Sequence, residues 1–136
     1  MIPIATLLGG YRTGYFPMAV DGGVRWFSPG QRGVIPLDRF RATRRLARML
    51  RQRRFRCTVN QAFRDVIAAC ASRADPHGNW IDEEILESYC LLHRAGYAHS
   101  VEVWDREQLV GGLYGVSLRG AFFGESMFHR VRDTSK

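Results

Sequence analysis

The fold is decided by residues 98–128, which read AHSVEVWDREQLVGGLYGVSLRGAFFGESMF. From His99 onward the apolar side chains recur with a period of two, which is typical of β-strands. Two polar turns, at 105–108 and 119–120, divide the stretch into three strand-length runs. Because turns this short join neighbouring antiparallel strands, we expect an antiparallel meander.

Two amphipathic helices are expected before the meander. A strand over 55–59 leads into the first helix, which Asn60 is expected to cap, and a loop at 75–79 separates it from the second. Asp82 is the expected N-cap of the second helix and Gly96 its end. The apolar residues at helical spacing are Phe63, Val66, Ile67 and Cys70 in the first, and Ile85, Leu86, Tyr89 and Leu92 in the second. Helices behind a meander predict an α+β fold.

The first half of the chain gives weaker patterns. A short helix is expected over 3–15, followed by loops and short strands in the glycine-rich stretch 14–33. Thr43 can cap a third helix. We expect its buried stripe to be Leu46, Met49 and Leu50.

Positive charge is concentrated in one segment. The chain carries 20 Lys and Arg residues against 13 acidic ones, for a net charge of +7, and all but Lys136 of the basic residues are arginine. Residues 39–56 hold nine arginines and no acid. Guanidinium groups match phosphate geometry, so this segment favours a nucleic-acid partner. The alternative is a solvated helix face in an arginine-rich protein.

Several classes of protein are not indicated. The apolar runs are far shorter than the ~20 residues that span a bilayer, and residues 1–15 lack the pattern of a signal peptide. We therefore expect a cytoplasmic protein with no membrane partner, and a monomer. The three cysteines, Cys57, Cys70 and Cys90, have apolar neighbours, which favours reduced core residues. Cys70, His77, Cys90 and His93 lack the short paired spacing of a zinc site, so no metal is expected.

Ordered segments along the chain resemble the leucyl/phenylalanyl-tRNA–protein transferase family. They are 10–18 (GYRTGYFPM), 26–29 (WFSP), 32–33 (RG), 60–63 (NQAF), 80–81 (WI), 92–96 (LHRAG), 98–104 (AHSVEVW), 109–115 (LVGGLYG) and 124–128 (GESMF). Any one of them is weak evidence, but together they span nearly the whole chain in the family's order.

The resemblance implies a GNAT-like (acyl-CoA N-acyltransferase-like) catalytic domain after a small N-terminal domain. On this basis residues 1–31 are a remnant of the N-terminal domain, and 32–136 are the front part of an incomplete catalytic domain. The family's later Asp-Cys-Gln segment is absent from the sequence. We therefore expect a chain truncated at both ends that turns over little by itself.

The resemblance also implies a reaction without any cofactor. Leu, Phe or sometimes Met is moved from aminoacyl-tRNA to the N-terminal Arg or Lys of an acceptor protein, which marks that protein for degradation. The ester is already activated, so the enzyme mainly positions the reactants and handles a proton.

Site residues follow from the same resemblance. Tyr11, Trp80 and Tyr89 fall on aromatic positions around the terminal adenosine and aminoacyl group, and Met18 stands where some members carry Trp. Leu113 and Phe122 correspond to the pocket for the Leu or Phe side chain, with Glu125 at its polar edge as the candidate catalytic group. The arginine cluster would bind tRNA phosphates beside this hollow, through Arg44, Arg45, Arg48, Arg51, Arg53 and Arg54. From the residues alone, Tyr89 and Phe122 lie on apolar stripes, where a core aromatic is more common than a ligand contact.

Two other functions stay open. One is a non-catalytic tRNA-binding fragment that keeps the arginines and aromatics. The other is an acyl-CoA-dependent N-acetyltransferase, which is disfavoured because no glycine-rich pyrophosphate loop follows the meander and Gly111-Gly112 falls within a strand.

Overall fold

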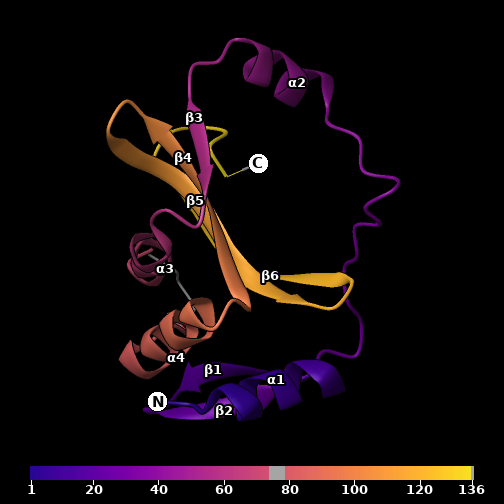
Figure 1. Cartoon of the computed structure of the whole chain (residues 1–136), viewed down its shortest axis with the longest axis vertical. Helices are drawn as coiled ribbons and strands as arrows, with labels where there is room; N and C mark the ends of the chain where they lie inside the picture. Colours follow the sequence, from indigo (N-terminus) through magenta and orange to yellow (C-terminus); the bar gives the residue numbers. More distant parts are fainter. Residues whose placement is uncertain (74–78, 136) are drawn as a thin grey trace.

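An antiparallel sheet of four strands forms the centre of the protein (Figure 1). The structure is a computed structural model, and it describes residues 1–73 and 79–135. The strands follow the order β3 (Arg56–Val59), β4 (Ala98–Asp105), β5 (Gln108–Leu118) and β6 (Ala121–His129). The expected meander is therefore confirmed, with β3 added at its edge. Most of the loop expected at 75–79 lies outside the described residues.

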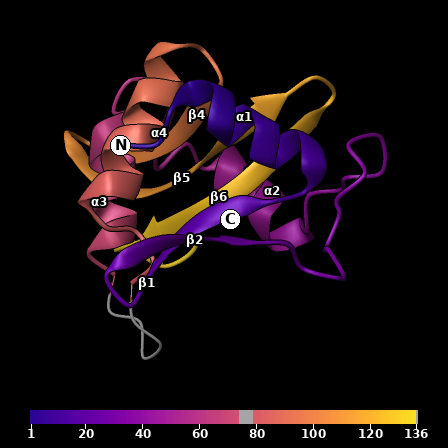
Figure 2. The same ribbon diagram turned by 90° about the horizontal axis from the view of Figure 1, so that it is seen from below.

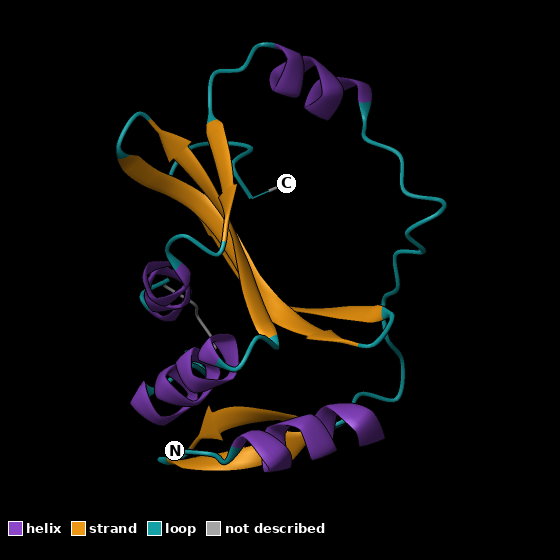
Figure 3. Cartoon of the chain, viewed as in Figure 1, coloured by secondary structure: helices purple, strands orange, loops and turns teal. Residues whose placement is uncertain are grey.

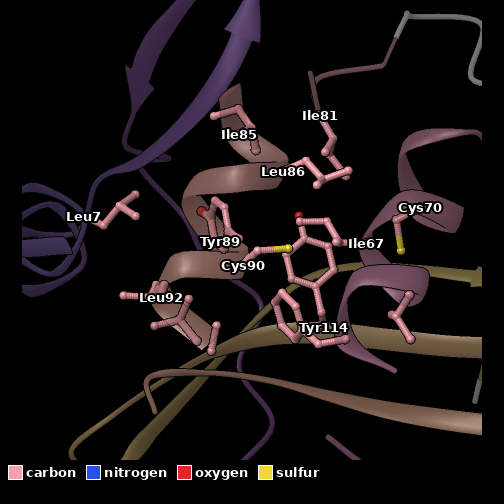
Figure 4. Close-up of a cluster of buried hydrophobic side chains, with 14 of the residues drawn as sticks. Leu7, Ile67, Cys70, Ile81, Ile85, Leu86, Tyr89, Cys90, Leu92 and Tyr114 are labelled. Carbon is pink, nitrogen blue, oxygen red and sulfur yellow. The ribbon is translucent and has the colours of Figure 1, made fainter. Parts of the chain in front are cut away.

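Helices α3 (Phe63–Ala71) and α4 (Glu83–Arg94) cover one face of this sheet, which confirms the α+β class (Figure 3). All eight of the apolar residues expected to face inward on these helices are buried. Figure 4 shows Tyr89 of α4 packed near Tyr114 of β5, and the two rings meet edge to face with centroids 5.6 Å apart. Asp82 caps α4 as expected, since its side chain accepts a hydrogen bond from the Ile85 N–H.

The N-terminal segment packs against α4. Helix α1 (Ile4–Thr13) precedes a hairpin of β1 (Phe16–Val20) and β2 (Gly23–Phe27). Leu7, Leu8 and Tyr11 of α1 belong to the same buried cluster as the inner residues of α4. The Ala19 N–H also donates to the Trp80 carbonyl oxygen at 2.9 Å, which ties the hairpin to the start of α4.

The expectation that Asn60 caps α3 is wrong, because the N-cap is Ala62. Asn60 instead takes a left-handed backbone with φ of 60°, and its side-chain oxygen accepts from the Ser100 N–H. The helix start is held by the fully buried Glu102, whose carboxylate accepts from the Ala62 N–H and the Ser100 hydroxyl. A carboxylate from a neighbouring strand thus replaces the local cap.

Helix α2 (Arg44–Arg51) begins as expected, with the Thr43 hydroxyl accepting from the Leu46 N–H. The expected buried stripe is wrong, because no residue of α2 is buried and Leu50 is 56% exposed. The helix stands off the sheet beyond the end of β3 (Figure 1). Its apolar side therefore has little to pack against.

Candidate active site

A cavity of about 580 Å³ lies between the N-terminal segment and the first residues of β6. Viewed from that end of the molecule, β6 runs behind α1 and the hairpin (Figure 2). The side chains that line the cavity are mostly aromatic or apolar, and they include Tyr11, Tyr15, Phe16, Met18, Val34, Trp80, Phe122 and Phe123. Among the described lining residues only Arg32 and Glu125 are charged. Such a cavity suits a planar, largely apolar ligand that also carries a few polar groups.

Five of the seven residues expected at the aminoacyl site line this cavity, namely Tyr11, Met18, Trp80, Phe122 and Glu125. They come from α1, β1, the segment before α4 and β6. Residues about 110 positions apart in the sequence are therefore brought together around one cavity.

Tyr89 lies behind the cavity wall. It is fully buried, and its hydroxyl is 2.5 Å from the hydroxyl of Tyr11. Both hydroxyls lie close enough to the Glu125 carboxylate to lower its pKa. Burial raises the pKa of each tyrosine above its usual value, so both phenols stay protonated. Tyr89 can therefore act on a ligand only indirectly, through the Tyr11 hydroxyl that it contacts.

Glu125 is the carboxylate of this cavity, and its pKa lies close to neutral. Loss of water contact raises that pKa from 4.5 to about 7, and the nearby hydroxyls of Tyr11 and Tyr89 and the charge of Arg32 oppose the rise. The protonated and ionised forms therefore coexist near neutral pH. A group of this kind can accept or donate a proton during a reaction.

Leu113 does not share the cavity of Phe122. It lines a smaller hollow of about 240 Å³, whose other walls include Arg73 and Met127. Trp80, Gly124 and Glu125 line both spaces, so the two are adjacent. The expected single pocket between Leu113 and Phe122 is thus divided at the Trp80–Glu125 wall.

The six arginines expected to bind tRNA are all exposed or half-buried at the surface. Arg45 is ion-paired with Asp133, and Arg54 lies 3.9 Å from Asp105. Within residues 1–73 and 79–135, no acidic partner is found for Arg44, Arg48, Arg51 or Arg53. Arg45, Arg48 and Arg54 also line a depression of about 350 Å³ beside α2.

These arginines do not lie beside the aromatic cavity as expected. Helix α2 stands at one end of the sheet, and α1 with the β1–β2 hairpin stands at the other (Figure 1). The reason is the extended segment between β2 and α2, which runs the length of the molecule. A single ligand that contacts both surfaces must therefore be long.

The described residues contain no group of three or more His, Cys, Asp or Glu side chains that could hold a metal ion. His77, one of the residues considered as a zinc ligand, lies outside the described residues. Burial raises the pKa of the Cys70 thiol to about 11, so this residue is an inert core thiol. The expectation that Cys57 is a core residue is wrong, because it is exposed on the edge strand β3. No helix in the described part of the chain could cross a bilayer, given its length and polarity.

Comparison with known proteins decides the family. Residues 34–136 match the model of the leucyl/phenylalanyl-tRNA protein transferase family, and residues 1–30 match the model of that protein's N-terminal domain. The chain belongs to this family. The leucyl/phenylalanyl-tRNA–protein transferase of Chlorobaculum parvum is 52% identical over the whole chain, which covers 72% of that relative.

Other members of the transferase family are similarly close. The leucyl/phenylalanyl-tRNA–protein transferase of Chlorobaculum tepidum is 48% identical over the whole chain, which covers 72% of it. The corresponding protein of Afipia carboxidovorans is 51% identical over 96% of the chain, which covers 59% of that relative. The chain thus spans part of the length of these transferases.

Sequence reasoning missed several residues that line this transferase's cavity, among them Tyr15, Phe16, Phe123 and Arg32. Arg32 and Phe16 stand in segments that carried the resemblance, but nothing in the sequence assigned them a ligand. Their position depends on the fold of the hairpin against β6, which is a tertiary contact.

Proposed function

We propose that this chain binds the aminoacylated 3′ end of tRNA and transfers Leu, Phe or Met to the N-terminal Arg or Lys of acceptor proteins. The observation that supports this most is the cavity in which Trp80, Phe122 and Glu125 meet. It joins aromatic walls to one carboxylate whose pKa is near neutral.

The aromatic walls suit the two parts of an aminoacyl-adenosine. An unpaired base stacks well on aromatic side chains, and Trp80 offers such a ring, while Tyr11, which is only 5% exposed, forms part of the wall. The apolar surface of Phe122 and, next to it, Leu113 can receive a Leu or Phe side chain. Met18 adds apolar contact on the β1 side.

Glu125 supplies the chemistry of the site. The α-amine of the acceptor attacks the ester carbonyl, a peptide bond forms, and the ester bond to the ribose oxygen breaks. The attacking amine loses a proton in this step; the ionised Glu125 accepts it and returns it to the leaving ribose oxygen, which departs as a hydroxyl. The Tyr11 and Tyr89 hydroxyls lower the pKa of this carboxylate and so favour its ionised form. Because the ester is already activated, positioning carries much of the rate and no cofactor is needed.

The arginines of α2 and its flanks bind the phosphates of the tRNA stem. Four of them have no acidic partner within the described residues, and the depression that three of the six line can receive a phosphate. A tRNA stem carries phosphates along its whole length, so its terminal nucleotide can occupy the cavity while the stem reaches α2. Such contacts tolerate different tRNA sequences.

The order of strand, two helices and meander supports a GNAT-like fold for residues 32–136, and the family matches of 1–30 and 34–136 support a boundary near residue 31. We place the protein in the cytoplasm as a monomer.

A transfer assay tests the function. The chain is incubated with radiolabelled Phe-tRNA and either a peptide that begins with Arg or the same peptide with an acetylated N-terminus. We expect a low level of label, on the free peptide alone, at a rate that rises with pH through about 7 as Glu125 ionises. Retention of tRNA without transfer would assign this chain binding only, and failure to retain Phe-tRNA would refute the proposal.

A further inference from the structure

Arg32 is the cation of the aromatic cavity. It is the one basic side chain among the described residues that line this space, and it faces Glu125 closely enough to lower the pKa of that carboxyl group. Its backbone lies in the exposed segment after β2, so the side chain reaches the cavity from the rim.

The structure holds the Arg32 guanidinium in place. One of its N–H groups donates to the Gly14 carbonyl oxygen at 2.5 Å, and the group lies over the Phe16 ring, 5.9 Å from the centroid. Gly14 ends α1 with φ of 85°, a conformation that directs the chain toward this contact and that favours glycine. A guanidinium group has five N–H donors, so most of them stay available to a ligand.

The terminal nucleotide offers Arg32 only one group of opposite charge. In an aminoacylated terminal nucleotide the base and ribose are neutral, and the aminoacyl group carries an amine rather than an acid. The backbone phosphate is the one anionic group. Guanidinium groups pair with phosphate through two parallel hydrogen bonds, and the rim is where the rest of the strand must leave the cavity.

We propose that Arg32 binds the 5′-phosphate of the terminal nucleotide and so fixes the aminoacyl ester opposite Glu125. This inference rests on the proposed function, and it assigns Arg32 a positioning role separate from that of the arginines on α2. Those arginines lie at the other end of the sheet and cannot reach the terminal phosphate (Figure 1).

The test uses a stable ligand in which phenylalanine is joined to the 3′ position of adenosine through an amide. The ligand is prepared with and without a 5′-phosphate, and its affinity for the chain is measured by calorimetry at low ionic strength. The native chain should bind the phosphorylated form about tenfold more tightly, as expected for one charge-assisted contact.

Three variants make the result specific. Arg32→Gln should lose this preference and keep its affinity for the unphosphorylated ligand within about twofold. Arg32→Lys, which keeps the charge but not the fork, should keep part of the preference. Arg25→Gln is the matched control, since Arg25 is an exposed arginine of β2 that pairs with Asp21 outside the cavity. It should behave as the native chain does.

The outcomes separate the two proposals. Equal affinity of the native chain for both ligands, or an unchanged preference in Arg32→Gln, would overturn the role of Arg32 and leave the proposed function standing. Failure of the native chain to bind either ligand would overturn both. Thermal melting of each variant shows that the comparison is made between folded proteins.

Discussion

The ionised form of Glu125 destabilises the folded chain, because its charge is partly shielded from water. Its pKa is about 7 in the folded chain, against 4.5 for the free side chain, so the folded state binds its proton more tightly than the unfolded state does. Stability from this group is therefore complete below about pH 4.5 and is lost as the pH rises toward 7. A carboxylate at a position where its charge destabilises the folded chain is typical of a functional site.

Replacement of Glu125 by glutamine removes this cost. Glutamine is neutral at every pH and has nearly the shape of glutamate, so Glu125→Gln should be more stable than the native chain by about 1–2 kcal/mol at pH 8. The difference should disappear near pH 4. Urea denaturation at both pH values measures it. A difference that does not change with pH would contradict the raised pKa of Glu125.

Tyr114 and Tyr89 provide a matched pair in the core. The Tyr114 hydroxyl is buried and has no hydrogen-bond partner in the described residues, whereas the Tyr89 hydroxyl bonds to Tyr11. Tyr114→Phe should therefore be neutral or stabilise the chain by up to about 1 kcal/mol, and Tyr89→Phe should cost about 1–3 kcal/mol. The free energies of unfolding of the two variants give the comparison. A larger loss in Tyr114→Phe than in Tyr89→Phe would contradict it.

At the level of elements, the shape of the cavity depends on the pairing of β5 with β6. The register shifts between Tyr114 and Gly115, so that Gly115 lies opposite Gly124 and next to Glu125. A Cβ atom at Gly115 would lie 2.2 Å from the Phe123 carbonyl oxygen and 2.6 Å from the Phe122 ring. Close approach of the two strands at this point therefore requires glycine.

An alanine at this position should disturb both stability and binding. Gly115→Ala should cost about 1–3 kcal/mol through overpacking and weaken ligand binding by displacing Phe122. Gly120→Ala, in the turn between the same strands, meets no atom within 4 Å and should change stability by less than about 0.5 kcal/mol. Chemical denaturation of both variants checks this. Equal stabilities would mean that the strands separate there at little cost.

Much of the element pattern can be predicted from the sequence, because it depends on local periodicity and capping. The meander, α3, α4 and the caps at Thr43 and Asp82 follow such local signals. The cap expected at Asn60 is wrong because the buried Glu102, about forty residues later, caps α3 in its place. The apolar side of α2 is not in the core because periodicity shows that a stripe exists but not that another element covers it.

For the whole molecule, the cavity could not be derived from local patterns. Tyr11 and Glu125 are far apart in sequence, and each reads as an ordinary core aromatic or strand-end acid. The family resemblance supplied five of the lining residues. It did not supply Arg32 or the division between Leu113 and Phe122, because these depend on how the hairpin and β6 fold against each other.

The separation of α2 from the cavity makes the arginines a distinct source of affinity. Arg48→Gln combined with Arg51→Gln should weaken tRNA binding and reduce the slope of log affinity against log salt by about 0.7–0.9 for each phosphate that is no longer neutralised. The decrease in affinity should be equal for charged and uncharged tRNA, as fluorescence anisotropy over a salt series can show. Arg25→Gln is again the control. A decrease confined to charged tRNA would place these arginines at the aminoacyl group instead.

The central claim is that the cavity of Tyr11, Trp80, Phe122 and Glu125 receives the aminoacyl end of tRNA. The most direct measurement compares the affinity of the chain for tRNA that carries phenylalanine through a stable 3′-amide with its affinity for the same tRNA without the amino acid. Burial of one phenylalanine side chain predicts binding about tenfold or more tighter for the charged form. Equal affinities would contradict the claim.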